Sequence, residues 1–93
     1  MPNWERYDAV LAHIEKHPEE WDQQHFCGSA CCFAGHVVQM FSSQRPLEKR
    51  VPYVGYNAMD LLKLTNNEAC WLFDPDRTIA DFHAFRAAGG IPT

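Results

Sequence analysis

The sequence predicts an all-α fold, a compact single-domain bundle of four to five helices around a central apolar helix at about residues 29–41. Apolar residues recur every three or four positions in several segments, which is the period of a helix face. The segment 29–41 is apolar almost all round, as expected for a buried helix. No segment of useful length alternates apolar and polar residues as a half-buried strand does. With 93 residues, 46% hydrophobic and 22% charged, the chain fits one small soluble domain.

The N-terminal segment is predicted to form a helix at about residues 4–16. Its apolar side chains fall on one helical face: Trp4, Tyr7, Leu11 and Ile14. Asn3 is a suitable N-cap, because its side-chain oxygen can accept a hydrogen bond from the first turn. Pro18 disfavours helical geometry at the residue before it and can open a second, short helix at about residues 18–24.

The central helix is predicted to begin after Ser29, as its N-cap, and to run to about Phe41. Gly35 costs about 1 kcal/mol relative to alanine inside a helix, so we expect a neighbouring helix to approach closely there. The residues at about 42–52 are polar, include two prolines and show no period. They are predicted to form a flexible polar loop.

The C-terminal half is predicted to contain two longer helices with a short one between them. The first covers about residues 53–64. Thr65 and Glu68 have the spacing of a capping box for the short apolar helix that follows. Thr78 is predicted to cap the last helix, which ends at Gly89 and Gly90 because glycine favours helix termination.

The charge distribution argues against nucleic-acid binding. The net charge of −4 lies in residues 1–24, which hold six acidic and two basic residues. The basic cluster Arg45, Lys49 and Arg50 is interrupted by Glu48, whereas nucleic acid requires a continuous basic surface. Residues 58–73 resemble a helix-turn-helix in outline, but the second helix would carry no Lys or Arg to contact phosphates or bases.

Location is predicted from two missing patterns. The sequence has no apolar run near the ~20 residues of a membrane span. It also lacks the pattern of a secretory signal peptide. We therefore expect a cytoplasmic protein without membrane insertion, in which the four cysteines are thiols or metal ligands rather than disulfides.

Four residues between positions 25 and 36 form a candidate zinc site: His25, Cys27, Cys32 and His36. Two thiolates and two imidazoles are a ligand set that structural zinc uses. Cys32 and His36 are four residues apart and share a helix face if the helix begins near Ser29. The four residues between Cys27 and Cys32 make an unusual spacing for a zinc module.

Three other interpretations of these residues remain open. Cysteine often packs as a small buried hydrophobe, and core packing is the interpretation that we favour for Cys31, Cys32 and Cys70. Cys27 could instead form a disulfide with Cys31 or Cys32. As a third alternative, Cys27 near His25 could be the nucleophile of a thiol enzyme. Elsewhere in the chain, His13 and His17 are four residues apart and could chelate a metal, but we expect them on a solvated helix face.

Several short strings resemble a group of small uncharacterised helical proteins of actinobacteria and the phages that infect them. These strings are Trp21-Asp22-Gln23, Cys27-Gly28 with Cys32-x-Ala34-Gly35-His36, and Leu64-Thr65-x-x-Glu68-Ala69. The resemblance covers about residues 11–85. Lys63 departs from it where glycine is expected, and Cys31 is an additional cysteine, so a site would use Cys27 and Cys32. The resemblance implies a setting, a small cytoplasmic protein encoded by an actinobacterium or by one of its phages, and no activity.

From this setting we expect a protein-interaction module that binds and modulates a host protein, and not an enzyme. The candidate partner-binding residues are Trp21, Tyr56, Trp71, Arg45, Lys49 and Arg50. Aromatic and arginine side chains dominate the energetics of protein interfaces, although core packing is the simpler role for the aromatic ones. The alternative is a zinc-stabilised nucleic-acid-binding regulator. No cofactor is expected, apart from the structural zinc considered above, and the oligomeric state is not predicted.

Overall fold

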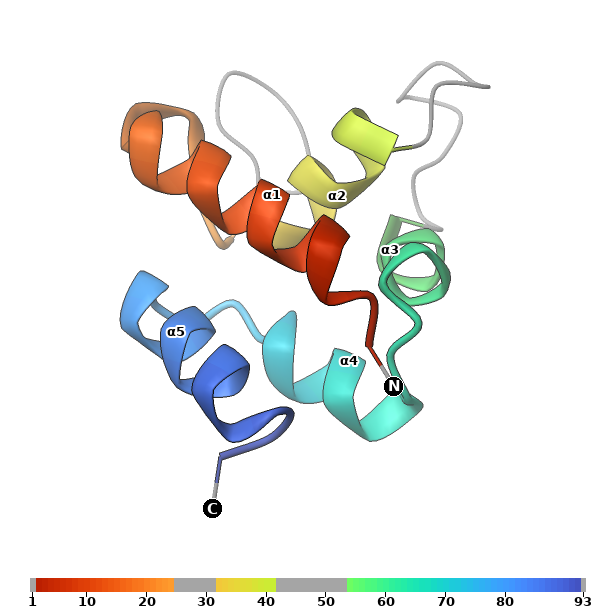
Figure 1. Ribbon diagram of the computed structural model, residues 1–93. Coiled ribbons are helices and arrows are strands. Elements are labelled where there is room, and N and C mark those ends of the chain that lie inside the picture. Colours follow the sequence, from red (N-terminus) through yellow and green to blue (C-terminus); the bar gives the residue numbers. More distant parts are fainter. Residues whose placement is uncertain (1, 25–31, 42–53, 93) are drawn as a thin grey trace.

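The computed structural model describes residues 2–24, 32–41 and 54–92, and in the helix that begins at residue 54 the side chains from residue 57 onward (Figure 1). The helices are α1 (Trp4–Lys16), the 3-10 turn η1 (Pro18–Glu20), α2 (Phe33–Phe41), α3 (Val54–Leu62), α4 (Asn66–Leu72) and α5 (Ile79–Ala88). The described residues contain no strand. The predicted all-α bundle is therefore confirmed.

Helix α1 lies between the pair α2 and α3 and helix α5. It packs against α2 and α3 on one side and against α5 on the other, as Figure 1 shows. Helix α4 contacts both α3 and α5 and so connects these two helices. In α2 the residues from Phe33 to Val38 are all buried, as its apolar sequence predicts.

The centre of the core is a group of aromatic rings from α1, α2 and α5. The Phe33 ring lies 4.7 Å from Phe82 and 5.0 Å from Tyr7, and Tyr7 stacks on Phe85 at 5.6 Å. The Tyr7 hydroxyl donates a hydrogen bond of 2.6 Å to the Phe82 carbonyl. Burial raises the pKa of Tyr7 well above its usual range, so this hydroxyl stays a donor. This buried hydrogen bond joins α1 to α5.

The predicted helix termini at Asn3, Thr65, Thr78 and Gly89 are confirmed. Asn3 accepts a hydrogen bond from the Arg6 amide, and Thr65 with Glu68 forms the capping box. Thr78 forms a second capping box, with Asp81. Gly89 ends α5 in the left-handed conformation, at φ 73°. These motifs depend on residues within a few positions of each other, so the sequence predicts them reliably.

Helix α2 begins later than predicted. Cys32 lies outside the helix, and its carbonyl accepts the first helical bond, from the His36 amide at 3.0 Å. The Cys32 sulfur accepts a bond from the Gly35 amide at 3.3 Å, so Cys32 is the N-cap. The predicted N-cap, Ser29, lies outside the described residues.

Two further boundaries differ from the prediction. The short helix predicted at 18–24 is a single 3-10 turn, η1. Helix α3 ends at Leu62, and Lys63 adopts the left-handed conformation at φ 55°. The Leu64 amide bonds the Met59 carbonyl and the Lys63 amide bonds the Asp60 carbonyl, which is a Schellman motif. The predicted loop at 42–52 lies outside the described residues, and none of the described helices is long and apolar enough to cross a membrane.

Candidate functional site

Gln23 lies where the N-terminal segment contacts the C-terminal half of the chain, and it bonds residues on both sides. This side chain is 7% exposed, and its amide group makes four hydrogen bonds. Its oxygen accepts from the Phe33 amide at 3.1 Å and from the Trp21 indole nitrogen at 3.2 Å. Its nitrogen donates to the carbonyls of Leu72, at 3.1 Å, and Asp74, at 3.0 Å. Gln23 thus joins the start of α2 to the end of α4.

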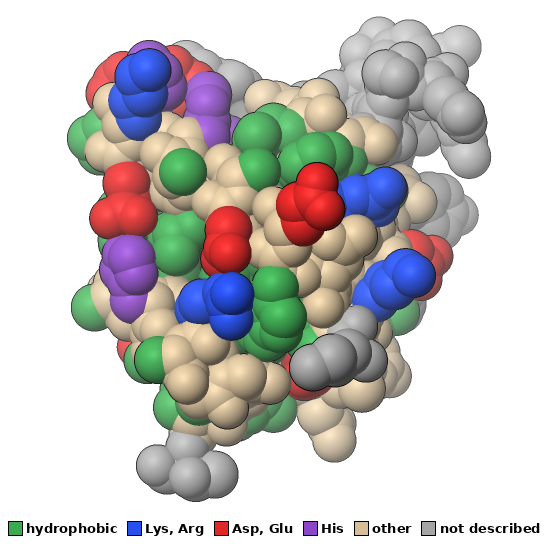
Figure 2. All heavy atoms as spheres, in the orientation of Figure 1, with side chains coloured by type: hydrophobic (Ala, Val, Ile, Leu, Met, Phe, Trp, Pro, Cys, Tyr) green, Lys and Arg blue, Asp and Glu red, His purple; other side chains and the backbone are tan. Residues whose placement is uncertain are grey.

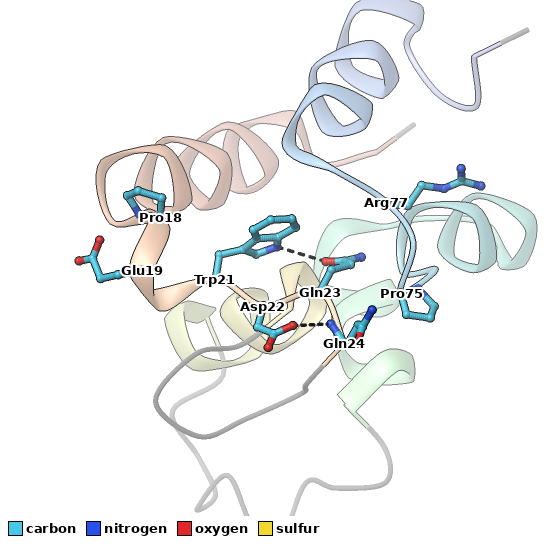
Figure 3. A pocket seen from close by; sticks show the side chains of 8 residues that line it. All are labelled: Pro18, Glu19, Trp21, Asp22, Gln23, Gln24, Pro75 and Arg77. Atoms are coloured by element: carbon cyan, nitrogen blue, oxygen red, sulfur yellow. Dashed lines mark hydrogen bonds between the residues drawn. The ribbon is translucent and has the colours of Figure 1, made fainter.

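An open depression lies beside Gln23, with a volume of about 490 Å³ (Figure 3). Two segments line it: Pro18, Glu19, Trp21, Asp22, Gln23 and Gln24 from one, and Pro75 and Arg77 from the other. In Figure 3 the Trp21 ring points toward the Gln23 amide in the middle of the depression. Pro18 with Glu19 and Pro75 with Arg77 lie on opposite sides of it. We call this feature the Trp21 depression.

Two of the predicted partner-binding aromatics lie at or near the Trp21 depression. Trp21 is half-buried, and its ring packs edge-on against Phe82 at 5.8 Å. Trp71 is also half-buried, and the Arg77 guanidinium lies 3.9 Å above its ring. Arg77 also donates a 2.7 Å hydrogen bond to the Trp71 carbonyl. Hence Arg77 connects the second predicted aromatic to the wall of the depression.

The other predicted partner-binding residues lie outside the described part of the structure. These are the side chain of Tyr56 and the residues Arg45, Lys49 and Arg50. Their assignment stays a prediction.

The predicted zinc site is described only in part. His25 and Cys27 lie outside the described residues, and Cys32 and His36 are buried at the start of α2. The His36 Nε2 atom lies 2.8 Å from the Glu20 carbonyl, which can only accept, so Nε2 is the protonated donor. A metal bound by His36 would therefore be held through Nδ1. The four-residue zinc site stays a prediction.

The environment of His36 favours its neutral form. Burial is the main cause that lowers the pKa of His36, and it outweighs the hydrogen bond to the Glu20 carbonyl, which acts in the opposite direction. A neutral ring with its proton on Nε2 matches the observed contact. His36 consequently fixes the backbone of Glu20 from inside the core.

A second cluster of histidines and carboxylates lies at the C-terminal end of α1. Figure 2 shows histidine and acidic side chains gathered there, at the upper left of the view. His13 Nε2 lies 3.2 Å from Glu20 Oε1, and His17 Nδ1 lies 3.7 Å from Glu20 Oε2 and 3.6 Å from Glu19 Oε1. The His13 and His17 rings are half-buried and 4.9 Å apart. We call these four residues the His/Glu cluster.

The spacing of His13 and His17 indicated a pair that could chelate a metal, but the sequence did not indicate that Glu19 and Glu20 lie beside it. The two rings were expected on a solvated face, because the four-residue spacing alone does not show what lies opposite them. The signal that was present is the Pro18-Glu19-Glu20 string directly after His17. Pro18 turns the chain back, and this turn brings Glu20 against His13.

Cys70 also differs from its predicted role. It is exposed on α4, whereas packing in an apolar helix was expected. The neighbouring Ala69 and Leu72 carry the buried face of this seven-residue helix. The candidate thiol nucleophile, Cys27, lies outside the described residues, so the thiol-enzyme alternative stays a hypothesis.

The fold and these surfaces define the chain as a small all-α domain with an open depression and a His/Glu cluster. It matches no protein-family model, and neither a curated protein nor a solved structure matches it.

Proposed function

We propose that the chain is a small cytoplasmic protein-interaction module, not an enzyme, that binds and modulates a host protein through the Trp21 depression. The observation that carries this proposal is the depression itself, where two segments place tryptophan, arginine and proline side chains on one open surface. The host setting comes from the resemblance to actinobacterial and phage proteins alone.

The residues of the depression have the chemistry of an interface anchor. Tryptophan and arginine are the side chains most enriched among residues that dominate binding energy. Hydrogen bonds to Gln23 and to the Trp71 carbonyl hold Trp21 and Arg77 in place before any partner arrives. A surface that is already ordered loses little conformational entropy on binding, which favours affinity.

Charge supports a basic partner segment. Glu19 and Asp22 line one side of the depression, and the first 24 residues carry a net charge of −4. A basic segment would be attracted to this side, and an apolar or aromatic side chain from it would pack on Trp21. Electrostatic attraction of this kind mainly accelerates association and weakens as salt is added.

Site-specific crosslinking tests the proposal in actinobacterial lysate. A photoreactive amino acid is introduced at Gln24 or at Pro75, both in the depression, or at Ala87, which is exposed on α5 and serves as the control. We expect one protein to be crosslinked from Gln24 and from Pro75 and not from Ala87. Equal crosslinking from all three positions, or none, would contradict the proposal. Crosslinking to RNA or DNA instead would favour the zinc-stabilised nucleic-acid-binding regulator.

A further inference from the structure

The His/Glu cluster has a geometry that single histidine–carboxylate pairs do not have. One ligand atom each from His17, Glu19 and Glu20 lies within 4.8 Å of the others. The two contacts of His17 Nδ1, at 3.6 and 3.7 Å, are longer than ordinary N–H···O hydrogen bonds. They are close to the separation of about 3.4 Å between two ligands of a tetrahedral ion with bonds of about 2.0–2.1 Å.

Glu20 lies at the centre of the cluster. Its two carboxylate oxygens face different rings, Oε1 facing His13 and Oε2 facing His17. Its backbone carbonyl bonds His36, which is 3% exposed. The Glu20 side chain is thus attached to a backbone that the core holds in place, and ligands positioned by outer contacts of this kind bind metals more tightly.

From this geometry we propose that the end of α1 and η1 bind a divalent transition-metal ion of the zinc class. His17, Glu19 and Glu20 each supply a ligand atom, and His13 orients the Glu20 carboxylate through its 3.2 Å contact with Oε1. One imidazole with two carboxylates suits zinc, nickel or cobalt(II), whereas calcium and magnesium prefer oxygen ligands alone. This site is separate from the predicted one at His25, Cys27, Cys32 and His36.

The proposed ion has a mechanical consequence for the fold. It would join His17, the C-cap of α1, to η1, and the His36 contact would extend this connection to α2. The ligand side chains are between 37% and 70% exposed to solvent, so an ion can enter without opening the core. Because the ion binds the folded chain, its presence should raise the stability of the domain.

The test follows the ring nitrogens of the histidines by NMR while Zn²⁺ is added to the full chain with its cysteines kept reduced. We expect Nδ1 of His17 to shift in a saturable way as Zn²⁺ binds. Glu20→Gln and His17→Gln should each weaken Zn²⁺ binding more than about tenfold, since even changes in outer-shell contacts cost that much. The thermal midpoint should rise with Zn²⁺ in the wild type and much less in these variants.

His83 supplies a matched control. Its Nε2 lies 3.1 Å from Glu15 Oε2 on the same molecule, but the structure places no third ligand from the described residues beside this exposed pair. His83→Gln should leave Zn²⁺ binding unchanged. Co²⁺ bound at the His/Glu cluster should lack the thiolate charge-transfer absorption that cysteine ligands produce. The proposal is overturned if Nδ1 of His17 does not shift, or if Glu20→Gln and His17→Gln bind Zn²⁺ as tightly as His83→Gln.

Discussion

Replacing Gln23 with leucine should destabilise the domain far more than a surface substitution does. The Gln23 side chain is buried, and its four hydrogen bonds connect groups that are distant in the sequence. Leucine fills a similar volume but offers neither a donor nor an acceptor. The Phe33 amide and the Leu72 carbonyl would then be buried without the partner that Gln23 supplies.

The size of the effect follows from these bonds. Each of the two buried groups left without its partner costs about 1–3 kcal/mol. The bonds to the Trp21 indole and the Asp74 carbonyl are partly exposed, so water can replace them and each adds less than about 1 kcal/mol. Burying leucine returns about 1–2 kcal/mol. We therefore expect Gln23→Leu to lower the free energy of unfolding by about 3–4 kcal/mol, a large part of the total for a domain of this size.

Urea denaturation followed by tryptophan fluorescence and far-UV circular dichroism measures this difference. Gln24→Leu is the matched control, because Gln24 is the next residue, is exposed and also lines the depression. The control should change the free energy of unfolding by less than about 0.5 kcal/mol. If Gln23→Leu lowers the free energy of unfolding no more than Gln24→Leu does, Gln23 does not stabilise the connection between the start of α2 and the end of α4.

A second variant distinguishes the loss of donors from the loss of packing. Gln23→Glu keeps the shape and the acceptor but, when ionised, has no proton for the Leu72 and Asp74 carbonyls. The pKa of the new carboxyl should be raised in the folded state, so the variant should be most stable below the unfolded pKa of about 4.3 and lose stability as pH rises. If the stability of Gln23→Glu relative to the wild type does not fall as the pH rises above about 4.3, the Gln23 amide does not act as a donor to these carbonyls.

Three other predictions concern stability. Burial lowers the pKa of His36 below 6.5, so the unfolded state binds the proton more readily than the folded state. The contribution of neutral His36 to stability should therefore be fully present above about pH 6.5 and be lost as the pH falls below it. His36→Gln should reduce this loss, measured by urea denaturation of both proteins with a chelator present. Tyr7→Phe removes the 2.6 Å bond to the Phe82 carbonyl and should cost about 1–2 kcal/mol, measured by the same urea titration; an unchanged midpoint would show that this bond contributes nothing. Lys63→Gly should stabilise the domain by about 0.5–1 kcal/mol, because Lys63 has a positive φ of 55° that glycine adopts more readily. Gly89→Ala should destabilise the domain, because Gly89 has φ 73°. If the thermal midpoints of both variants shift in the same direction, positive φ does not explain the effects.

The sequence predicts the parts of this fold that depend on near neighbours. The caps at Asn3, Thr65 and Thr78 and the termination at Gly89 each involve residues a few positions apart, and all are present. The departure at Lys63 was also visible, as a lysine where a glycine is expected, and its positive φ explains why glycine would suit the position. Local patterns carry this information because they are satisfied within one turn of the chain.

The candidate sites depend on contacts that no local pattern contains. Gln23 bonds Leu72 and Asp74, which lie 49 and 51 positions later, and its place in the Trp21-Asp22-Gln23 string does not show this. The His/Glu cluster likewise requires the turn after Pro18 to return Glu20 to His13. The four-residue spacing of His13 and His17 does not show that the chain turns back after Pro18. The two rings were therefore expected on a solvated helix face.

The central claim is that the Trp21 depression binds a partner protein. Its most direct test is the dissociation constant of the crosslinked partner, once purified, for the wild type, for Trp21→Ala and for Met40→Ala. Met40 is a large hydrophobic side chain, 40% exposed on α2 and outside the depression. With folding of each variant verified by circular dichroism, Trp21→Ala should weaken binding by about thirtyfold, the effect of losing about 2 kcal/mol, and Met40→Ala should have no effect. Equal affinities for the wild type and Trp21→Ala would contradict the claim.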